Sequence, residues 1–185
     1  MAPVTRGNAR ARKRGSVASQ PRLALSKPWG PAAQAFGRYQ RVGLDTICFL
    51  YHLSRHPLYS AITAELFALI EAGRLTAVTS SLALIEILAR PKQVGHQSAA
   101  DNYRVVLATF PNLELRRADI AITELAADLR VRYGVTTPEA IQLATAIVHG
   151  ADAFVGNSEV VRGVKEIEVV LLKDLRASTS SEGRA

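Results

Sequence analysis

Short apolar segments with β-like composition alternate with amphipathic helical patterns from Val42 to the end of the chain. Five segments are predicted as strands, at residues 42–45, 75–79, 113–115, 153–155 and 169–172. Strands that alternate with helices in this way form a parallel sheet with helices on both faces. We therefore expect an α/β fold with a central parallel sheet of four to five strands, and a ligand site beyond the carboxyl ends of the strands.

The connecting helices are predicted at residues 46–54, 59–72, 81–90, 98–110, 119–133 and 137–149. Pro91 is expected to end the third of them, because proline removes a backbone donor and clashes with the preceding turn. Thr137 is expected to cap the last helix, with Pro138 in its first turn.

Basic residues are concentrated at the start of the chain. Residues 1–41 hold nine Lys and Arg residues and no acid, in a protein of net charge +7. We predict a disordered basic arm at 1–38, a folded domain at 39–176 and a disordered tail at 177–185. The arm is either a phosphate-binding segment, a solvated tail without a selected role, or an organelle transit peptide. Its candidate nucleic-acid-binding residues are Arg6, Arg10, Arg12, Lys13 and Arg14.

Several classes of protein are excluded or disfavoured. No apolar run approaches 18 residues, so no membrane-spanning helix is expected. Cys48 is the single cysteine, which excludes an internal disulfide framework and favours a reducing compartment such as the cytoplasm, or indifference to redox conditions. The aromatic content of 6% argues against a base-stacking platform. Glycine-rich nucleotide-binding loops and the G-x-S-x-G elbow of serine hydrolases do not occur.

Three isolated carboxylates interrupt neutral segments. Asp45 follows the first predicted strand, Glu86 lies within an apolar helix, and Glu139 lies in the first turn of the last helix. No Lys or Arg accompanies any of them in its segment, and an unpaired buried carboxylate is costly. Separately, Asp45 reads equally well as a turn residue and Glu139 as a surface residue. Together, all three can converge at one edge of a parallel sheet.

Carboxylates gathered in this way repel one another, so one takes up a proton unless a divalent cation lies between them. Oxygen ligands without a His or Cys cluster favour Mg²⁺ or Mn²⁺ over zinc. Such ions activate water and neutralise the charge of a transferring phosphoryl group. The residues therefore indicate hydrolysis of a phosphate ester.

The order of three motifs resembles the PIN-domain family of metal-dependent ribonucleases, and the VapC-like toxins within it. The motifs are LDTICFLYHL, SSLALIEILARP and TTPEAIQLATAIVHGADAFVGNSEVV, followed by a closing VVLLKDL. The likeness covers most of the chain after the basic arm. It implies a three-layer α/β/α fold around the parallel sheet.

The resemblance assigns Asp45, Glu86 and Glu139 as catalytic residues and as ligands of Mg²⁺ or Mn²⁺. Glu139 stands where the family usually has Asp, and Ser158 replaces the family's fourth acid. That replacement puts a second metal and the full catalytic rate in doubt. Glu159 is either a substitute for the missing acid or a solvent-exposed residue at a helix start.

Thr46 and Asn157 are candidate polar supports of the site, with turn or capping roles as the alternative. The resemblance further implies an RNA substrate, an antitoxin protein as a possible partner, and a homodimer. The leading hypothesis is a metal-dependent endoribonuclease, possibly the toxin of a toxin–antitoxin pair. The alternative is a catalytically weakened RNA-binding or partner-binding module. An aspartyl-phosphate enzyme is disfavoured, because Ile47 stands where its D-x-D pattern needs a second acid.

Overall fold

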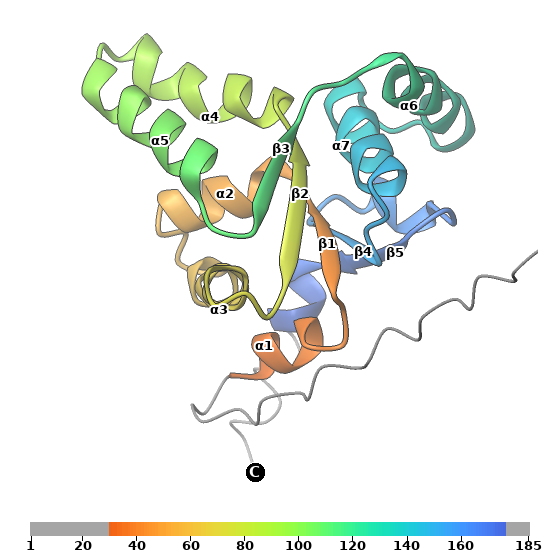
Figure 1. The fold of residues 1–185 in the computed structure, drawn as a ribbon, viewed down its shortest axis with the longest axis horizontal. Helices are drawn as coiled ribbons and strands as arrows, with labels where there is room; N and C mark the ends of the chain where they lie inside the picture. The colour runs from red at the N-terminus through yellow and green to blue at the C-terminus, as the bar shows by residue number, and fades with distance from the viewer. Residues whose placement is uncertain (1–29, 177–185) are drawn as a thin grey trace, which may run out of the picture.

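A five-stranded, all-parallel sheet lies at the centre of the computed structural model, which describes residues 30–176 (Figure 1). Its order is β3-β2-β1-β4-β5. The strands are β1 (Arg41–Leu44), β2 (Thr76–Ser80), β3 (Leu113–Arg116), β4 (Ala153–Gly156) and β5 (Glu168–Leu171). The predicted parallel sheet is confirmed, with each strand within one or two residues of its expected position.

The order of the strands reverses direction at β1. Val42 pairs with Ala77 of β2 on one side, and Gly43 pairs with Phe154 of β4 on the other. The chain therefore winds outward from β1 both ways, and the gap between the ends of β1 and β4 is a topological switch point. Open parallel sheets bind their ligands at such a point.

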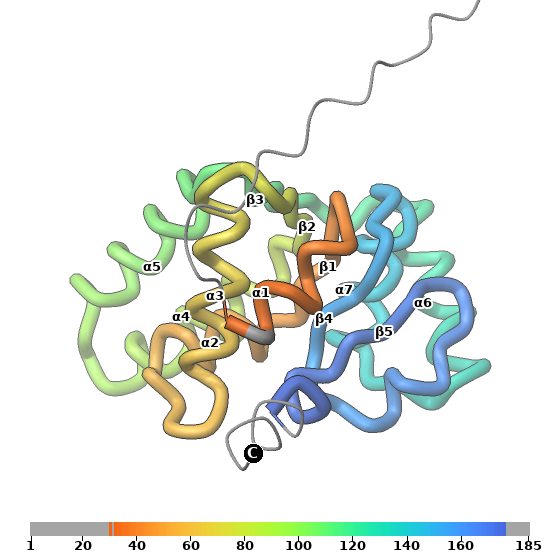
Figure 2. Tube along the Cα trace, turned by 90° about the horizontal axis from the view of Figure 1, so that it is seen from below, coloured from red at the N-terminus to blue at the C-terminus, as the bar shows by residue number. Residues whose placement is uncertain are grey.

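Helices cover both faces of the sheet and complete the three predicted layers. They are α1 (Pro31–Phe36), α2 (Thr46–Leu53), α3 (Ser60–Glu71), α4 (Leu82–Gln93), α5 (Gln97–Thr109), α6 (Ile120–Tyr133) and α7 (Thr137–Val148), with a 3₁₀ turn η1 (Val160–Gly163). The views in Figures 1 and 2 place α2 and α3 on one face and α6 and α7 on the other. Helices α4 and α5 pack on each other and extend past the edge formed by β3.

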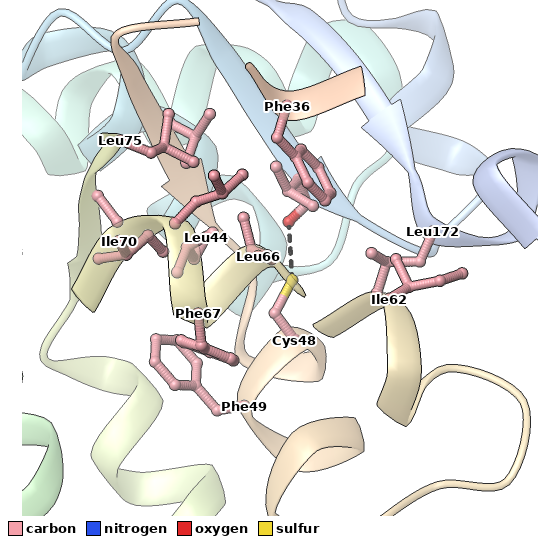
Figure 3. Close-up of a cluster of buried hydrophobic side chains, with 14 of the residues drawn as sticks. Phe36, Leu44, Cys48, Phe49, Ile62, Leu66, Phe67, Ile70, Leu75 and Leu172 are labelled. Carbon is pink, nitrogen blue, oxygen red and sulfur yellow. Dashed lines mark hydrogen bonds between the residues drawn. The ribbon is translucent and has the colours of Figure 1, made fainter. Parts of the chain in front are cut away.

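The larger hydrophobic core lies between the sheet and α1, α2 and α3 (Figure 3). Leu44 of β1 and Leu66 of α3 are completely buried there, as is Phe36 of α1. Cys48 is also fully buried, and its Sγ donates to the carbonyl oxygen of Val155 at 3.4 Å. The cysteine is thus a core residue of α2.

The second core lies between the sheet and α6 and α7, around Leu143 and Phe154. Helix α7 lies directly against β1 at Gly43. A Cβ atom at Gly43 would lie 2.2 Å from the Cβ of Ala146, so only glycine allows this approach. The close packing places the first turn of α7 beside the end of β1.

The prediction of disorder through residue 38 is wrong at its C-terminal end. Residues 31–36 form α1, and the buried ring of Phe36 anchors this helix to the larger core. Glu65 of α3 accepts a hydrogen bond from the backbone nitrogen of Ala33 at 2.7 Å, which satisfies a free donor in the first turn of α1. All five candidate nucleic-acid-binding residues of the arm lie outside the described residues, as does the predicted tail at 177–185. The five are Arg6, Arg10, Arg12, Lys13 and Arg14.

Two predicted helix limits are also wrong. Helix α4 continues through Pro91 to Gln93, since the loss of one backbone donor near an exposed helix end does not stop the helix. Thr136, rather than Thr137, is the N-cap of α7, and Thr137 is the first residue of the helix. Within residues 30–176, no helix has the length and apolar character needed to cross a membrane.

Candidate active site

Asp45 lies where β1 ends and α2 begins, at the switch point of the sheet. Its carboxylate accepts a hydrogen bond from the backbone nitrogen of Ile47 at 3.1 Å, so it is also the N-cap of α2. On its other side lies Gly156, the last residue of β4. A Cβ atom at Gly156 would lie 3.3 Å from Asp45 Oδ2, so glycine leaves room for the carboxylate. The predicted turn role and the predicted site role of Asp45 are therefore compatible.

Glu86 lies on α4, which follows β2 in the chain. The expectation that its carboxylate is buried is wrong. Ala83 and Ile87 turn into the core, while Glu86 is exposed and its neighbour Ile85 is 66% exposed. The carboxylate therefore meets water on one side and the cleft described below on the other.

Glu139 forms a reciprocal capping box with Thr136 at the start of α7. Its Oε2 accepts hydrogen bonds from the backbone nitrogen and the hydroxyl of Thr136, at 2.8 and 2.7 Å. Thr136 Oγ1 in turn accepts from the backbone nitrogen of Glu139 at 3.4 Å. The side chain is thus partly held by its own helix, as the capping-box motif dictates.

One cleft of about 390 Å³ brings the three acids together. It opens at the carboxyl edge of the sheet, between α2, α4 and α7. The residues that line it are Asp45, Ile47, Tyr51, Glu86, Thr136, Pro138, Glu139, Gln142, Asn157 and Ser158. The topology therefore gathers at one place the acids that the sequence separates by 41 and 53 positions.

The acids in this cleft interact electrostatically. Burial raises the pKa of Asp45, and the negative charges of Glu139 and Glu86 raise it further, to about 6, against the lowering effect of the Ile47 N–H. Burial also acts to raise the pKa of Glu139, but hydrogen bonds from Ser158 and Thr136 outweigh it and hold that pKa below its ordinary value. Environments that push two acid pKa values apart are typical of functional sites.

Gln142 is a site residue that the sequence analysis missed. It is 2% exposed and lies one helical turn after Glu139. Its Oε1 accepts from the backbone nitrogen of Ser80 at 2.8 Å, and its Nε2 donates to Thr46 Oγ1 at 3.0 Å. Oε1 also lies 2.9 Å from Thr79 Oγ1, whose single proton is directed either to it or to the Leu44 carbonyl oxygen at 2.8 Å.

Through these bonds Gln142 connects α7 to the start of α2, next to Asp45, and to the end of β2. An amide alone in an otherwise apolar helix was the available signal in the sequence, since a buried Gln requires partners for both its oxygen and its nitrogen. Thr46 is part of this network and is buried, so its predicted role as a polar support matches its position.

Asn157 supports the cleft from the β4 side. Its Nδ2 donates to the hydroxyl of Tyr51 at 3.2 Å, and its Oδ1 accepts from the backbone nitrogen of Lys173 at 3.0 Å. The side chain thereby joins the ends of β4 and β5 to α2. Tyr51 is a second cleft residue that the sequence analysis did not single out.

Ser158 stands at the position of the missing fourth acid, and Glu159 is the next residue in the chain. Ser158 lines the cleft and is hydrogen-bonded to Glu139. Glu159 forms salt bridges with Arg162 and Lys173, and its hydrogen bonds to these cations lower its pKa to about 2. Since Glu159 is engaged there and does not line the cleft, the structure favours the solvent-exposed alternative for this residue.

The donor chemistry of the cleft fits a hard divalent cation. Three carboxylates line the cleft without Lys or Arg among the lining residues, and the pKa of Asp45 is raised by burial and, to a smaller extent, by the charges of the other two acids. The acids are nonetheless spread around the cleft. Among residues 30–176, no three His, Cys, Asp or Glu side chains lie close enough to bind one ion as they stand. A shared ion therefore requires the exposed Glu86 and the capping Glu139 to turn inward.

Fold and site together define a three-layer α/β protein with an acidic cleft at the switch point of a parallel sheet. The family model of the PIN domain matches residues 42–165, which is well over half of the chain. The chain belongs to the PIN-domain family, whose members are in general nucleases. The resemblance noted from the sequence is thereby confirmed.

Two solved structures share this fold. A chain of a toxin–antitoxin complex from Klebsiella pneumoniae is 21% identical, with a TM-score of 0.54, over 71% of this chain and 97% of the other. A chain of VapBC2 from Rickettsia felis, bound to a DNA fragment from its promoter, is 15% identical, with a TM-score of 0.57, over 71% and 98%. No match is found among curated proteins. At these identities the likeness establishes the fold of a VapC-like PIN domain.

Proposed function

We propose that this protein is a metal-dependent endoribonuclease that hydrolyses phosphodiester bonds of RNA. The observation that carries the proposal is the convergence of Asp45, Glu86 and Glu139 on one cleft, with the pKa of Asp45 raised by burial and by the other two acids. Capping accounts for Asp45 and Glu139 as separate helix-end residues, but not for their meeting with Glu86 in one cleft without a cation among its lining residues. The PIN-domain family and the fold shared with toxin–antitoxin complexes support the same conclusion.

In this account Asp45, Glu86 and Glu139 would hold Mg²⁺ or Mn²⁺, and a bound ion would supply activation of water and neutralisation of charge on the phosphoryl group. Asp45 would bind in its ionised form, which its pKa of about 6 still leaves as the main form at neutral pH. The Ile47 N–H orients its carboxylate, and Gln142 donates a hydrogen bond to Thr46, the residue that follows Asp45 in the chain. Hydrogen bonds from Thr136 and Ser158 keep Glu139 charged in the metal-free protein, and its side chain would turn inward from Thr136 to reach the ion.

The test is cleavage of a single-stranded RNA by the purified full-length protein with Mg²⁺ or Mn²⁺. We expect cleavage that stops on addition of a chelator and that is lost in Asp45→Asn. Asp152→Asn is the matched control, because Asp152 binds the backbone nitrogens of Gln40 and Arg41 at the opposite edge of the sheet. Absence of cleavage with every divalent metal at high protein concentration would refute the proposal.

A specific observation favours a second candidate, a catalytically weakened RNA-binding or partner-binding module. Ser158 brings no charge where the family usually has an acid, and it is hydrogen-bonded to Glu139. This candidate predicts RNA binding without cleavage, and binding that does not depend on a divalent cation. The cleavage assay above therefore separates the two candidates directly.

We further propose a toxin–antitoxin setting for this protein. The two solved relatives are toxin–antitoxin complexes, which supports an antitoxin protein as the partner of this chain, with the toxin acting on RNA in the cytoplasm. We also propose a homodimer, and an arm whose basic residues within 1–29 bind phosphates. Light scattering of the protein alone tests the dimer, and co-purification with the product of a neighbouring short gene tests the antitoxin.

A further inference from the structure

Three aromatic rings gather beside the acidic cleft. Tyr51 of α2 stacks on Tyr59, with ring centroids 4.6 Å apart and planes 15° apart. His56, in the turn between α2 and α3, lies 4.5 Å from Tyr51 and 5.1 Å from Tyr59. All three side chains are partly exposed, and Tyr51 itself lines the cleft together with Asp45, Glu86 and Glu139.

The orientation of Tyr51 is fixed from several directions. Its hydroxyl accepts from Asn157, which itself accepts from the backbone nitrogen of Lys173, just after β5. Its backbone carbonyl accepts from the backbone nitrogen of His56 at 2.9 Å. The turn that carries His56 is ordered as well, since His56 Nδ1 accepts from the backbone nitrogen of Leu58 at 3.2 Å. The Tyr51 ring is therefore already held in place before a ligand binds, so binding costs little conformational entropy at this side chain.

A fixed, partly exposed ring next to carboxylates has a defined chemical complement. The carboxylates are suited to a metal-bound phosphate, and the part of the Tyr51 ring that lines the cleft is suited to a planar group next to that phosphate. In a polynucleotide this group is a nucleobase, and aromatic side chains bind bases by stacking. The low overall aromatic content excludes an extended platform, but it leaves room for a single stacking position.

We propose that Tyr51, backed by Tyr59, is a positioning residue that stacks on the nucleobase adjacent to the scissile phosphate. The inference rests on the proposed ribonuclease function for the identity of the ligand. Ring stacking supplies affinity without reading the base edge, so Tyr51 sets where the strand lies more than which base is accepted. Asn157 contributes by holding the Tyr51 hydroxyl.

Fluorescence of 2-aminopurine tests the stacking without relying on cleavage. Single-stranded RNA with one 2-aminopurine, moved along the strand, is titrated with the full-length protein in chelator. We expect quenching at one or two positions, retained in Tyr51→Phe and Tyr51→Trp and lost in Tyr51→Leu. The RNA affinity of Tyr51→Leu should fall about 5- to 100-fold, the range measured for loss of one base–aromatic stack. Equal quenching in the wild type and Tyr51→Leu would overturn the proposal.

Tyr103, a partly buried tyrosine on α5, offers a matched control, and Tyr103→Leu should leave the quenching unchanged.

If Tyr51→Leu does not fold, photocrosslinking of 5-iodouridine RNA to the wild-type protein decides the question. A crosslink mapped to Tyr51 supports the proposal, and crosslinks mapped only to other residues contradict it. If Tyr51-dependent quenching is found in a protein that never cleaves RNA, the nuclease function fails while the base-binding site stands. If RNA is cleaved without that quenching, only the present inference fails.

Discussion

The backbone nitrogen of Ser80, at the end of β2, donates a 2.8 Å hydrogen bond to the side-chain oxygen of Gln142 on α7. Both residues are almost completely buried, and the bond crosses the edge of the sheet directly beneath the acidic cleft. It places the end of β2, which leads to the helix of Glu86, in fixed relation to the helix of Glu139. The spacing of two of the three acids thus depends on one neutral amide.

Gln142→Leu should destabilise the fold. The substitution leaves the Ser80 N–H without its acceptor in a buried place, at a cost of about 1–3 kcal/mol. Urea unfolding monitored by circular dichroism measures this cost, with the exposed Gln93→Leu as the control. Cleavage should also fall, because the ends of β1 and β2 lose their common anchor. A Gln142→Leu protein as stable and as active as the Gln93→Leu protein would show that the network is dispensable.

Asp45→Asn should stabilise the metal-free protein at neutral pH. The pKa of Asp45 in the folded state, about 6, is raised above its ordinary value of 3.8, so the fold favours the neutral acid. The unfolded chain releases this proton first, and the wild type therefore loses stability as the pH rises from about 4 to 6. Asparagine carries no charge and keeps the N-cap bond to Ile47.

The expected difference in unfolding free energy is on the order of 2 kcal/mol above pH 7 and close to zero below pH 4. Thermal melts of both proteins in chelator across this range measure it, and the difference between them removes the contributions of other acids such as Glu114. Addition of Mn²⁺ should make the wild type the more stable of the two proteins, since only the wild type gains stability by binding the ion. A stability difference that does not change with pH would mean that the pKa of Asp45 is not raised in the folded protein.

Ser158→Asp should tighten the binding of a divalent ion by about tenfold, equivalent to about 1.4 kcal/mol. The substitution restores a fourth carboxylate at the cleft and replaces a hydrogen bond to Glu139 with repulsion, which a cation then relieves. Calorimetric titration with Mn²⁺ of the wild type, Ser158→Asp and Ser158→Asn provides the measurement. Equal affinities in the Asp and Asn proteins would show that position 158 does not face the ion.

Removal of residues 1–29 should weaken RNA binding without weakening the fold. That segment holds seven of the chain's Lys and Arg residues. If it contacts phosphates, its loss should reduce the slope of log affinity against log salt by roughly 3 for single-stranded RNA. Removal of residues 1–36 is the contrasting change, because it also deletes α1 and the buried Phe36 and should lower the melting temperature. An unchanged salt slope after the shorter deletion would assign no binding role to the arm.

Much of the architecture could be predicted from the sequence because its signals are local. Apolar runs such as that of β1 and stop signals such as Gly134 at the end of α6 specify element type, and the alternation of elements specifies a parallel sheet. Asp45 could be identified as a candidate because it follows a strand. Local signals were weaker at the start of the domain. There the buried ring of Phe36 packs α1, the last part of the basic segment, against the core.

The features that could not be predicted from the sequence depend on contacts between distant parts of the chain. The exposure of Glu86 could not be predicted from its apolar neighbours, because only Ala83 and Ile87 of that helix are fully buried and Ile85 is exposed as well. The roles of Gln142 and Tyr51 depend on partners 62 and 106 positions away, Ser80 and Asn157. No periodicity of the sequence encodes such pairs, so they become visible only with the fold.

The central claim is that Asp45, Glu86 and Glu139 share one divalent ion. Anomalous diffraction from crystals of the full-length protein grown with Mn²⁺ tests it most directly. The account predicts one strong manganese peak in the cleft, with oxygens of all three carboxylates at about 2.1 Å, and no peak there in Asp45→Asn. A manganese ion bound elsewhere, or a cleft that stays without metal while the three acids remain apart, would contradict it.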